Sequence, residues 1–334
     1  MSTILEPQPV LPPFAALIED AEIERAKIYG RAAKSSSTRR EYARDWAAFE
    51  RYCGSRNLAA LSAEPQTIAR YVATLAGTLT IATIRRRIVA ISQVHQERGL
   101  ETPTSHKVVR EVLAGIANTH GSAVRQKEAL TIDLLRAVLL TLQTERNALK
   151  ATRDRALLLL GFAGAFRRSE LAALDVDDLR FDRRGLTVTL RRSKTDQAGA
   201  GREVGVPFLT VETLCAVHAL RDWLARADVT EGPVFRTFSL PRRRGEPSRL
   251  QPQRIDPKDV ARLVQRVVRN ARLKGDFAAH SLRAGFVTSA AQKKVPEVDI
   301  QRVTGHRSVA TLRRYVRRAT LFDDAPLAAI VENT

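Results

Sequence analysis

The chain has 334 residues, a length that suits about two domains, and its 55 basic against 36 acidic residues give a formal net charge of +19. This excess indicates a polyanionic partner, DNA or RNA. The alternative is that the chain is simply rich in arginine and has no such partner. No apolar run reaches the roughly 18 residues of a membrane-spanning helix, and the opening MSTILEPQPVLPPF lacks the features of a signal peptide. The two cysteines match no disulfide framework or zinc spacing, so we expect a soluble, cytoplasmic protein with no membrane partner.

The first part of the chain predicts a helical domain. Residues 1–35 are expected to form a flexible lead-in that ends in the polar run KSSS. Apolar and aromatic side chains then recur at helical spacing in four segments, which cover residues 37–57, 65–77, 80–99 and 105–121. The polar stretch GSAVRQKEA follows and is typical of a linker. We therefore expect a helical domain over residues 36–120 and a linker over residues 121–130.

The second part predicts a larger domain that is also mostly helical, over residues 131–320. Alternation in LTVTL, a glycine-containing turn and then REVGVPF indicate a small antiparallel sheet. The segment EGPVFRTFSLPRRRGEPSRLQPQR is interpreted as a basic, proline-rich loop, and residues 321–334 as a short tail helix. The expected helices cover residues near 131–145, 151–163, 211–227, 256–272, 280–294 and 296–305. The predicted fold class is thus mainly α, in two helical domains, with one small antiparallel β-sheet.

Four separated segments carry side chains suited to chemistry on a phosphate. GAFRRSELAAL has an arginine after an apolar helix and a glutamate three residues later, and RRSKTD puts a lysine at the end of a strand. HSLRAG places a histidine and an arginine on one helix face, and GHRSVATLRRY ends at the only tyrosine after Tyr71. The candidate catalytic residues are Arg167, Glu170, Lys194, His280, Arg283, His306 and Tyr315.

Each candidate also has an ordinary structural interpretation. Arg167 and Glu170 could form an ion pair on a helix surface, the two histidines could cap a helix or close a turn, and Tyr315 could be a core residue. Lys194 is more specific, because it is the single lysine between Lys150 and Lys258 in a chain that otherwise uses arginine. Lysine can lose its proton at accessible pH, which a guanidinium group cannot do.

Together these residues form a set that can transfer a phosphoryl group without a metal. Two arginines can bind the non-bridging oxygens of a phosphodiester, where negative charge grows in the transition state. Tyr315 would be the nucleophile, Lys194 the general acid for the leaving sugar oxygen, and the histidines would bind phosphate or move the phenol proton. An ester between the phenol and phosphate retains the energy of the broken bond, so rejoining would need no nucleotide cofactor.

The order Arg, Lys, His-x-x-Arg, Gly-His, Tyr resembles the tyrosine recombinase (phage integrase) family. RRSEL resembles the first arginine box of that family, HSLRAG its second and GHRSVATLRRY its closing box. DWAAFERYC, AEPQTIARYVATL and TIATIRRRIVAISQVHQERGL resemble the core-binding, SAM-like domain of the Cre-type branch, so the resemblance extends over residues 35–334. His306 is the choice more common in the family, whereas Cre has tryptophan at that position.

The resemblance implies an integrase-type catalytic fold and a site-specific recombinase. Tyr315 would form a 3′-phosphotyrosyl bond inside a cage of Arg167, Lys194, His280, Arg283 and His306, with Glu170 in support. The family uses this set for DNA integration, excision and resolution, without metal or nucleotide cofactor. The implied partners are double-stranded DNA with an inverted-repeat site and three further copies of the chain, which form a tetramer on two duplexes. The tail would dock on a neighbouring subunit, with packing on its own domain as the alternative.

Residues that contact DNA outside the cage are harder to identify from the sequence. Basic helix faces and the arginine cluster of the proline-rich loop are the candidates, and a solvated surface is the alternative for each of them. Phosphate contacts of this kind would position the protein and would not specify a sequence. The candidates are Arg39, Arg85, Arg86, Arg242, Arg243, Arg244 and Lys258.

Three other functions share some of these features. A type IB topoisomerase-like enzyme would use the same covalent chemistry but would not exchange strands. A non-catalytic DNA-binding relative is disfavoured because every chemical position is filled. A metal-dependent nuclease is disfavoured because the sequence has no cluster of carboxylates with the spacing of metal ligands.

Overall fold

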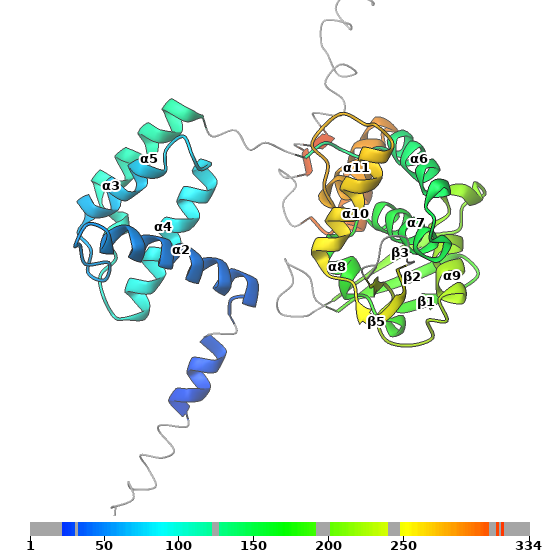
Figure 1. Cartoon of the computed structure of the whole chain (residues 1–334), viewed down its shortest axis with the longest axis horizontal. Helices are drawn as coiled ribbons and strands as arrows, with labels where there is room; N and C mark the ends of the chain where they lie inside the picture. The colour runs from blue at the N-terminus through cyan, green and yellow to red at the C-terminus, as the bar shows by residue number, and fades with distance from the viewer. Residues whose placement is uncertain are drawn as a thin grey trace, which may run out of the picture. The chain divides into compact units, whose positions relative to one another are not determined.

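The computed structural model divides the chain into two compact units, Met1–Arg125 and Gln126–Thr334 (Figure 1). Both units are built mainly from helices, as the sequence predicts. None of the helices in the described part of the chain is long and apolar enough to cross a membrane. The structure describes residues 22–30, 33–121, 127–191, 201–239, 248–306, 312–313 and 315–316.

The first unit contains a four-helix cluster in which α2 lies against α4 and α3 against α5. The helices begin where polar side chains accept the first free N–H groups: Ser35 Oγ accepts from Thr38 N at 3.2 Å, and Thr80 Oγ1 from Thr83 N at 3.3 Å. Their apolar faces enclose a core around Phe49, which is fully buried. The four helices are α2 (Ser36–Gly54), α3 (Pro65–Leu75), α4 (Ile81–Glu97) and α5 (Lys107–His120), with a 3-10 turn η1 (Pro103–Ser105) before α5.

The second unit packs its helices around α7 (Ala148–Ala163), whose run of leucines is buried. α7 lies against α9 and α11, and α10 lies against α6 and α8. The short helix α8 (Arg168–Ala173) was not among the helices expected from periodicity, because six residues are too few to show a helical period. The other helices are α6 (Ile132–Thr141), α9 (Ala216–Arg226), α10 (Pro257–Asn270), α11 (His280–Gln292) and α12 (Glu297–Thr304), with 3-10 turns η2 (Leu142–Thr144), η3 (Val176–Asp178) and η4 (Glu212–Leu214).

The expected antiparallel sheet has three strands, in the order β1 (Leu179–Phe181), β2 (Gly185–Leu190) and β3 (Arg202–Pro207). Val188 of β2 faces Leu179 of β1 and Val204 of β3, and both valines are buried. Because β2 and β3 are antiparallel neighbours, the two ends of the segment that carries Lys194 lie side by side. Lys194 itself falls outside the described residues.

A second small sheet corrects the interpretation of the proline-rich segment as a loop. β4 (Arg236–Phe238) pairs with β5 (Leu250–Arg254), and Ile255 N donates to Phe235 O at 2.9 Å. The strands are short and mostly polar, so no alternation of apolar residues marks them in the sequence. Their pairing depends on buried neighbours such as Phe235 and Ile255, which anchor the hairpin in the core.

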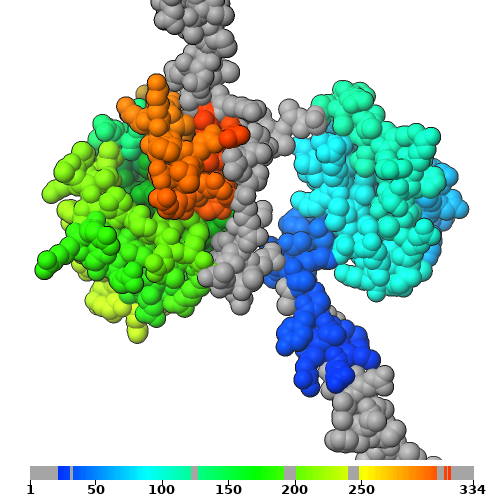
Figure 2. All heavy atoms as spheres, turned by 180° about the vertical axis from the view of Figure 1, so that it is seen from behind, coloured from blue at the N-terminus to red at the C-terminus, as the bar shows by residue number. Residues whose placement is uncertain are grey.

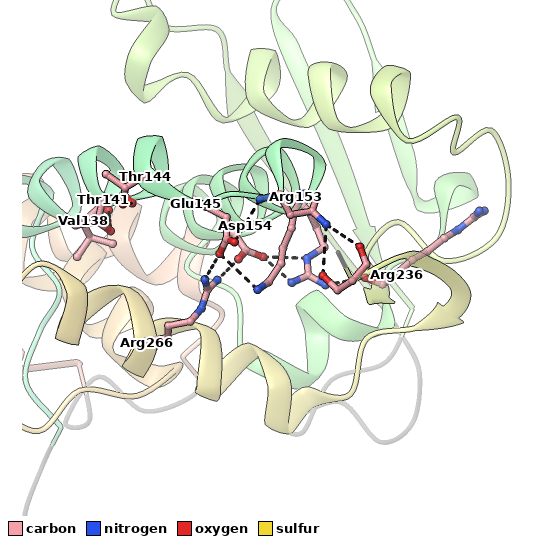
Figure 3. Close-up of polar contacts among 11 residues, drawn as sticks. Val138, Thr141, Thr144, Glu145, Arg153, Asp154, Arg236 and Arg266 are labelled. Atoms are coloured by element: carbon pink, nitrogen blue, oxygen red, sulfur yellow. Dashed lines mark hydrogen bonds and ion pairs between the residues drawn. The ribbon is translucent and has the colours of Figure 1, made fainter. Parts of the chain in front are cut away.

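A buried ionic network joins α7 to α10 and to β4 (Figure 3). The Asp154 carboxylate is fully buried and accepts from Arg153, with Nη2 at 2.6 Å, and from Arg266. Arg153 Nη1 also donates to the carbonyl oxygen of Arg236 at 3.0 Å. Arg266 Nη1 also contacts Glu145, so the network links two arginines and two carboxylates around the fully buried Asp154.

Candidate active site

The first arginine segment is organised by the carboxylate of Glu170. Oε2 accepts the backbone N–H of Arg167 at 2.8 Å, and Oε1 accepts from the Arg167 guanidinium at 2.6 Å. Glu170 is almost completely buried, so its charge is directed at Arg167 and not at solvent. Glu170 therefore fixes both the backbone and the side chain of Arg167 at the start of α8.

Arg283 joins α11 to the turn before α8. Its side chain is buried, and Nη1 donates to the carbonyl oxygen of Ala165 at 2.8 Å. Burial and the positive charge of Arg167 lower the pKa of Arg283 to about 10. Its Nη2 is buried and has no hydrogen-bond partner within the described residues, a costly arrangement that an anion would relieve. The two arginine segments thus lie together as a site for an oxyanion.

His280 and Tyr315 meet at hydrogen-bond distance although they are 35 residues apart in the sequence. His280 Nε2 lies 2.9 Å from Tyr315 Oη, and their ring centroids are 6.3 Å apart. Figure 2 shows the red atoms of residues 312, 313, 315 and 316 beside the orange atoms of the preceding helices. Tyr315 packs on a small apolar cluster around Ile300. The phenol is held next to a group that can accept its proton.

His306 follows a left-handed turn at the end of α12. Gly305 has a φ of 63°, a conformation that glycine adopts without strain, and it ends α12 directly before His306. The His306 Nδ1 lies 2.8 Å from Thr304 Oγ1, and its ring centroid is 6.4 Å from that of Tyr315. Burial and the charge of Arg283 lower the pKa of His306 to about 4, so the ring is neutral at pH 7.

Arg202 joins this group, although the sequence pattern did not indicate it. It is the first residue of β3, and its Nη1 donates to the carbonyl oxygen of Val303 at 2.6 Å. Nη2 lies 3.9 Å from Glu170 Oε2, and burial lowers the pKa of Arg202. An arginine at the start of a strand matches no motif, so only the contact of its side chain with Val303 of α12 reveals its place.

The structure brings six of the seven candidate catalytic residues into the second unit's site, and the seventh, Lys194, lies outside the described residues. The cluster Arg242 to Arg244 and the tail at 321–334 also lie outside them. The described residues contain no group of three or more His, Cys, Asp or Glu side chains placed to hold a metal ion. The described groups that can bind a phosphate are therefore cationic side chains and the two histidines.

The candidate DNA contacts differ in how far their side chains are engaged. Arg85 and Lys258 are exposed, and Arg39 is exposed with Nη1 donating to Lys34 O at 3.1 Å. Arg86 instead donates through Nε to Asp45 Oδ2 at 2.7 Å. A phosphate contact by Arg86 would compete with this ion pair, and all four residues stay predictions.

The chain matches two family models. The model of the phage integrase family matches residues 128–321, and the model of the phage integrase N-terminal SAM-like domain matches residues 28–101. An integrase/recombinase xerD homolog from Selenomonas ruminantium is 35% identical over 322 residues, which cover 93% of this chain and 92% of that protein. The tyrosine recombinase XerC of Myxococcus xanthus is 26% identical over 313 residues, 92% of this chain and 93% of that protein.

Solved structures show the same fold at lower sequence identity. The XerH site-specific recombinase bound to palindromic difH substrate, in a post-cleavage complex, has a TM-score of 0.58 at 20% identity over 82% of this chain and 73% of that chain. A lambda integrase dimer bound to a COC′ core site has a TM-score of 0.57 at 16% identity over 92% of this chain and 81% of that chain. The SAM-like first domain and integrase-type catalytic fold are thereby confirmed, while the Cre-like branch stays a prediction.

Proposed function

The chain belongs to the phage integrase family, and from this premise we propose that it is a site-specific DNA recombinase that acts through a 3′-phosphotyrosyl intermediate. The observation that carries the proposal is the 2.9 Å contact between Tyr315 Oη and His280 Nε2 beside the paired arginine segments. A phenol has an ordinary pKa near 10, so it needs a neighbouring base and cations to attack at neutral pH. His280 supplies the base, and Arg167 and Arg283 supply the cations.

In the proposed reaction, Tyr315 Oη attacks the phosphorus of one DNA strand and its proton passes to His280. The bond between phosphorus and the 5′ oxygen breaks, and Lys194 donates a proton to the leaving oxygen. Arg167 and Arg283 bind the non-bridging oxygens, where one such donor is worth about 3 kcal/mol in a transition state. One phosphate ester replaces another, so a 5′ hydroxyl from a second duplex can reverse the steps without metal or nucleotide.

Neutral His306 would complete the cage by a hydrogen bond to phosphate. Its pKa of about 4 means that it can donate and accept without a net charge at pH 7. Glu170 keeps Arg167 in place through its two hydrogen bonds, at 2.8 and 2.6 Å. His306 and Arg167 would therefore touch the phosphate, whereas Glu170 would only orient Arg167.

We assign residues 36–120 to DNA binding, 121–130 to the linker and 131–320 to catalysis, and we propose an inverted-repeat site in double-stranded DNA. The proposed assembly is a homotetramer on two duplexes, with the tail at 321–334 docked on a neighbour, in the cytoplasm. Solved relatives of the same fold are bound to DNA, namely difH, a COC′ core site and a transposon right end. The charge of +19 supports the same class of partner.

A nicked suicide substrate tests the covalent step. The DNA site is first selected from a random pool, and a labelled strand is then followed into a denaturation-resistant complex with the protein. We expect the complex to carry the DNA segment 5′ of the cleavage site, joined through its 3′ phosphate, and to form in EDTA. It should be lost in Tyr315→Phe but retained in Tyr29→Phe, a residue that is 73% exposed. Complex formation by Tyr315→Phe, or dependence on a divalent metal, contradicts the proposal.

Strand exchange separates the two kinds of cleaving enzyme. Two duplexes that carry the selected site should yield recombinant products with this chain and no added protein. Relaxation of supercoils without recombinants would instead indicate a type IB topoisomerase-like enzyme. Retention of DNA without a covalent complex in any condition would indicate a non-catalytic relative.

A further inference from the structure

Arg202 holds the turn that presents His306. Its Nη1 donates to Val303 O at 2.6 Å, and a β-carbon on Gly305 would lie 3.0 Å from Nε and 3.1 Å from Cζ. The guanidinium group therefore lies flat against the backbone of Gly305. Val303 O is one of the last carbonyl groups of α12, which have no partner inside the helix, and a cation at a helix C-terminus is favourable.

The other end of the Arg202 guanidinium faces the first arginine segment. Nη2 is 3.9 Å from Glu170 Oε2, and the same carboxylate oxygen accepts the backbone N–H of Arg167. Nη2 is buried without a hydrogen bond in the described structure, so the bond to Val303 is the stronger of the two contacts. Arg202 thus connects the start of α8 to the end of α12 through one side chain.

We propose that Arg202 is a positioning residue that holds the Gly305–His306 turn in register with Glu170 and Arg167. The inference rests on the proposed function, because the turn matters for catalysis only if His306 binds the reacting phosphate. The geometry also explains the glycine before His306: a side chain at 305 would meet the Arg202 guanidinium as well as the left-handed backbone. Arg202 acts on the reaction through His306.

The charge around His306 gives the arrangement a measurable signature. Burial comes first among the causes that depress the pKa of His306 to about 4, followed by the charges of Arg283, Arg167, His280 and Arg202. Among the described residues, the Tyr315 ring is a further titratable neighbour of His306, with its centroid 6.4 Å away. Loss of Arg202 removes one positive charge and releases the turn toward water, and both changes raise the pKa of His306.

The first test measures single-turnover cleavage of the suicide substrate at saturating protein. Arg202→Met should slow formation of the covalent complex by about 10²-fold, since a small misplacement of a catalytic group has an effect of this size. Arg202→Lys keeps the charge and one donor and should recover part of the rate. Arg180→Met removes an arginine that is 71% exposed on the same sheet and should leave the rate unchanged.

A second test uses Gly305→Ala, alone and combined with Arg202→Met. Strain from the positive φ acts in both backgrounds, but the clash with the guanidinium acts only where Arg202 is present. We expect Gly305→Ala to slow cleavage more in the unmodified background than in the R202M background, so that the two effects are not additive. Independent effects on the rate would overturn the inference.

NMR titration of His306 in the full chain separates this inference from the function on which it rests. The signal is assigned by its loss in His306→Gln, and Arg202→Met should move its pKa from about 4 toward the ordinary value of 6.5. An unchanged pKa overturns the positioning role even if the protein cleaves DNA. A wild-type protein that forms no covalent complex contradicts the proposed function, while the titration still decides the role of Arg202.

Discussion

The carbonyl oxygen of Leu130 lies so close to Gly285 that a β-carbon on the glycine would be 1.8 Å from it. Leu130 N also donates to the carbonyl oxygen of Ser281 at 2.9 Å, and Ile132 N donates to Ser289 Oγ at 2.9 Å. The segment that leads into α6 is therefore bound along α11. Because α11 carries His280 and Arg283, this contact helps to set the position of the candidate site.

Gly285→Ala should destabilise the second unit strongly. The obstacle is backbone, which cannot rotate away as a flexible side chain could, so we expect a loss of at least about 3 kcal/mol in the free energy of unfolding. Urea unfolding followed by circular dichroism measures this loss. Gly205→Ala is the control in the same unit, because a β-carbon there meets nothing within 4 Å. Equal stability of the two variants would contradict the close approach.

The sequence predicted the helices well because their signal is local. Apolar residues recur at helical spacing in the four segments that form α2 to α5. The chemistry of the motifs likewise indicated that His280 and Tyr315 belong to one site, and the structure brings them to 2.9 Å. Periodicity and motif order thus carry information on which elements exist and which residues act together.

Features that depend on contacts between distant segments could not be predicted. The bond from Arg283 to Ala165 O joins residues 118 positions apart, and the clamp of Arg202 on Val303 joins residues 101 apart. The sheet of β4 and β5 is similar, since its short polar strands pair only because flanking residues enter the core. In each case tertiary packing determines the contact, and no property of the local sequence indicates it.

Protonation of His306 should make the protein less stable in mild acid. The pKa of His306 is about 4 in the folded protein, below the ordinary value of 6.5, so the unfolded chain binds more protons between these values. Its contribution to stability is complete above about pH 6.5 and is lost progressively as the pH falls toward 4. Urea midpoints should fall over this window, and less so in His306→Gln. The control His218→Gln, which removes an exposed histidine, should keep the full pH dependence.

The Asp154 network should be sensitive to the loss of its central carboxylate. Asp154→Ala leaves Arg153 and Arg266 without the buried charge that they share, and removing one partner of a buried pair typically lowers stability by about 3–5 kcal/mol. Asp222→Ala is the matched control, because its ion pair with Arg226 is exposed and should contribute less than about 1 kcal/mol. Urea unfolding distinguishes the two, and similar small losses would show that the network is dispensable.

Arg85 and Arg86 are neighbours on α4, but the structure predicts different effects of their removal. Arg85 is exposed, so Arg85→Gln should weaken DNA binding and reduce the log–log dependence on salt by about 0.9 for one lost phosphate contact. Arg86 pairs with Asp45, whose side chain is 2% exposed, so Arg86→Gln leaves a buried carboxylate with less compensation and should destabilise the first unit.

Fluorescence anisotropy over a salt series, together with urea unfolding, measures both effects on the same preparations. We expect Arg85→Gln to reduce the salt dependence of DNA binding with no loss of stability. Arg86→Gln should instead lower the urea midpoint of unfolding. If Arg86→Gln were as stable as wild type and changed the salt dependence by about 0.9, the ion pair with Asp45 would be exchanged for a phosphate when DNA binds. Arg86 would then be a DNA contact, as its place on a basic helix face first suggested.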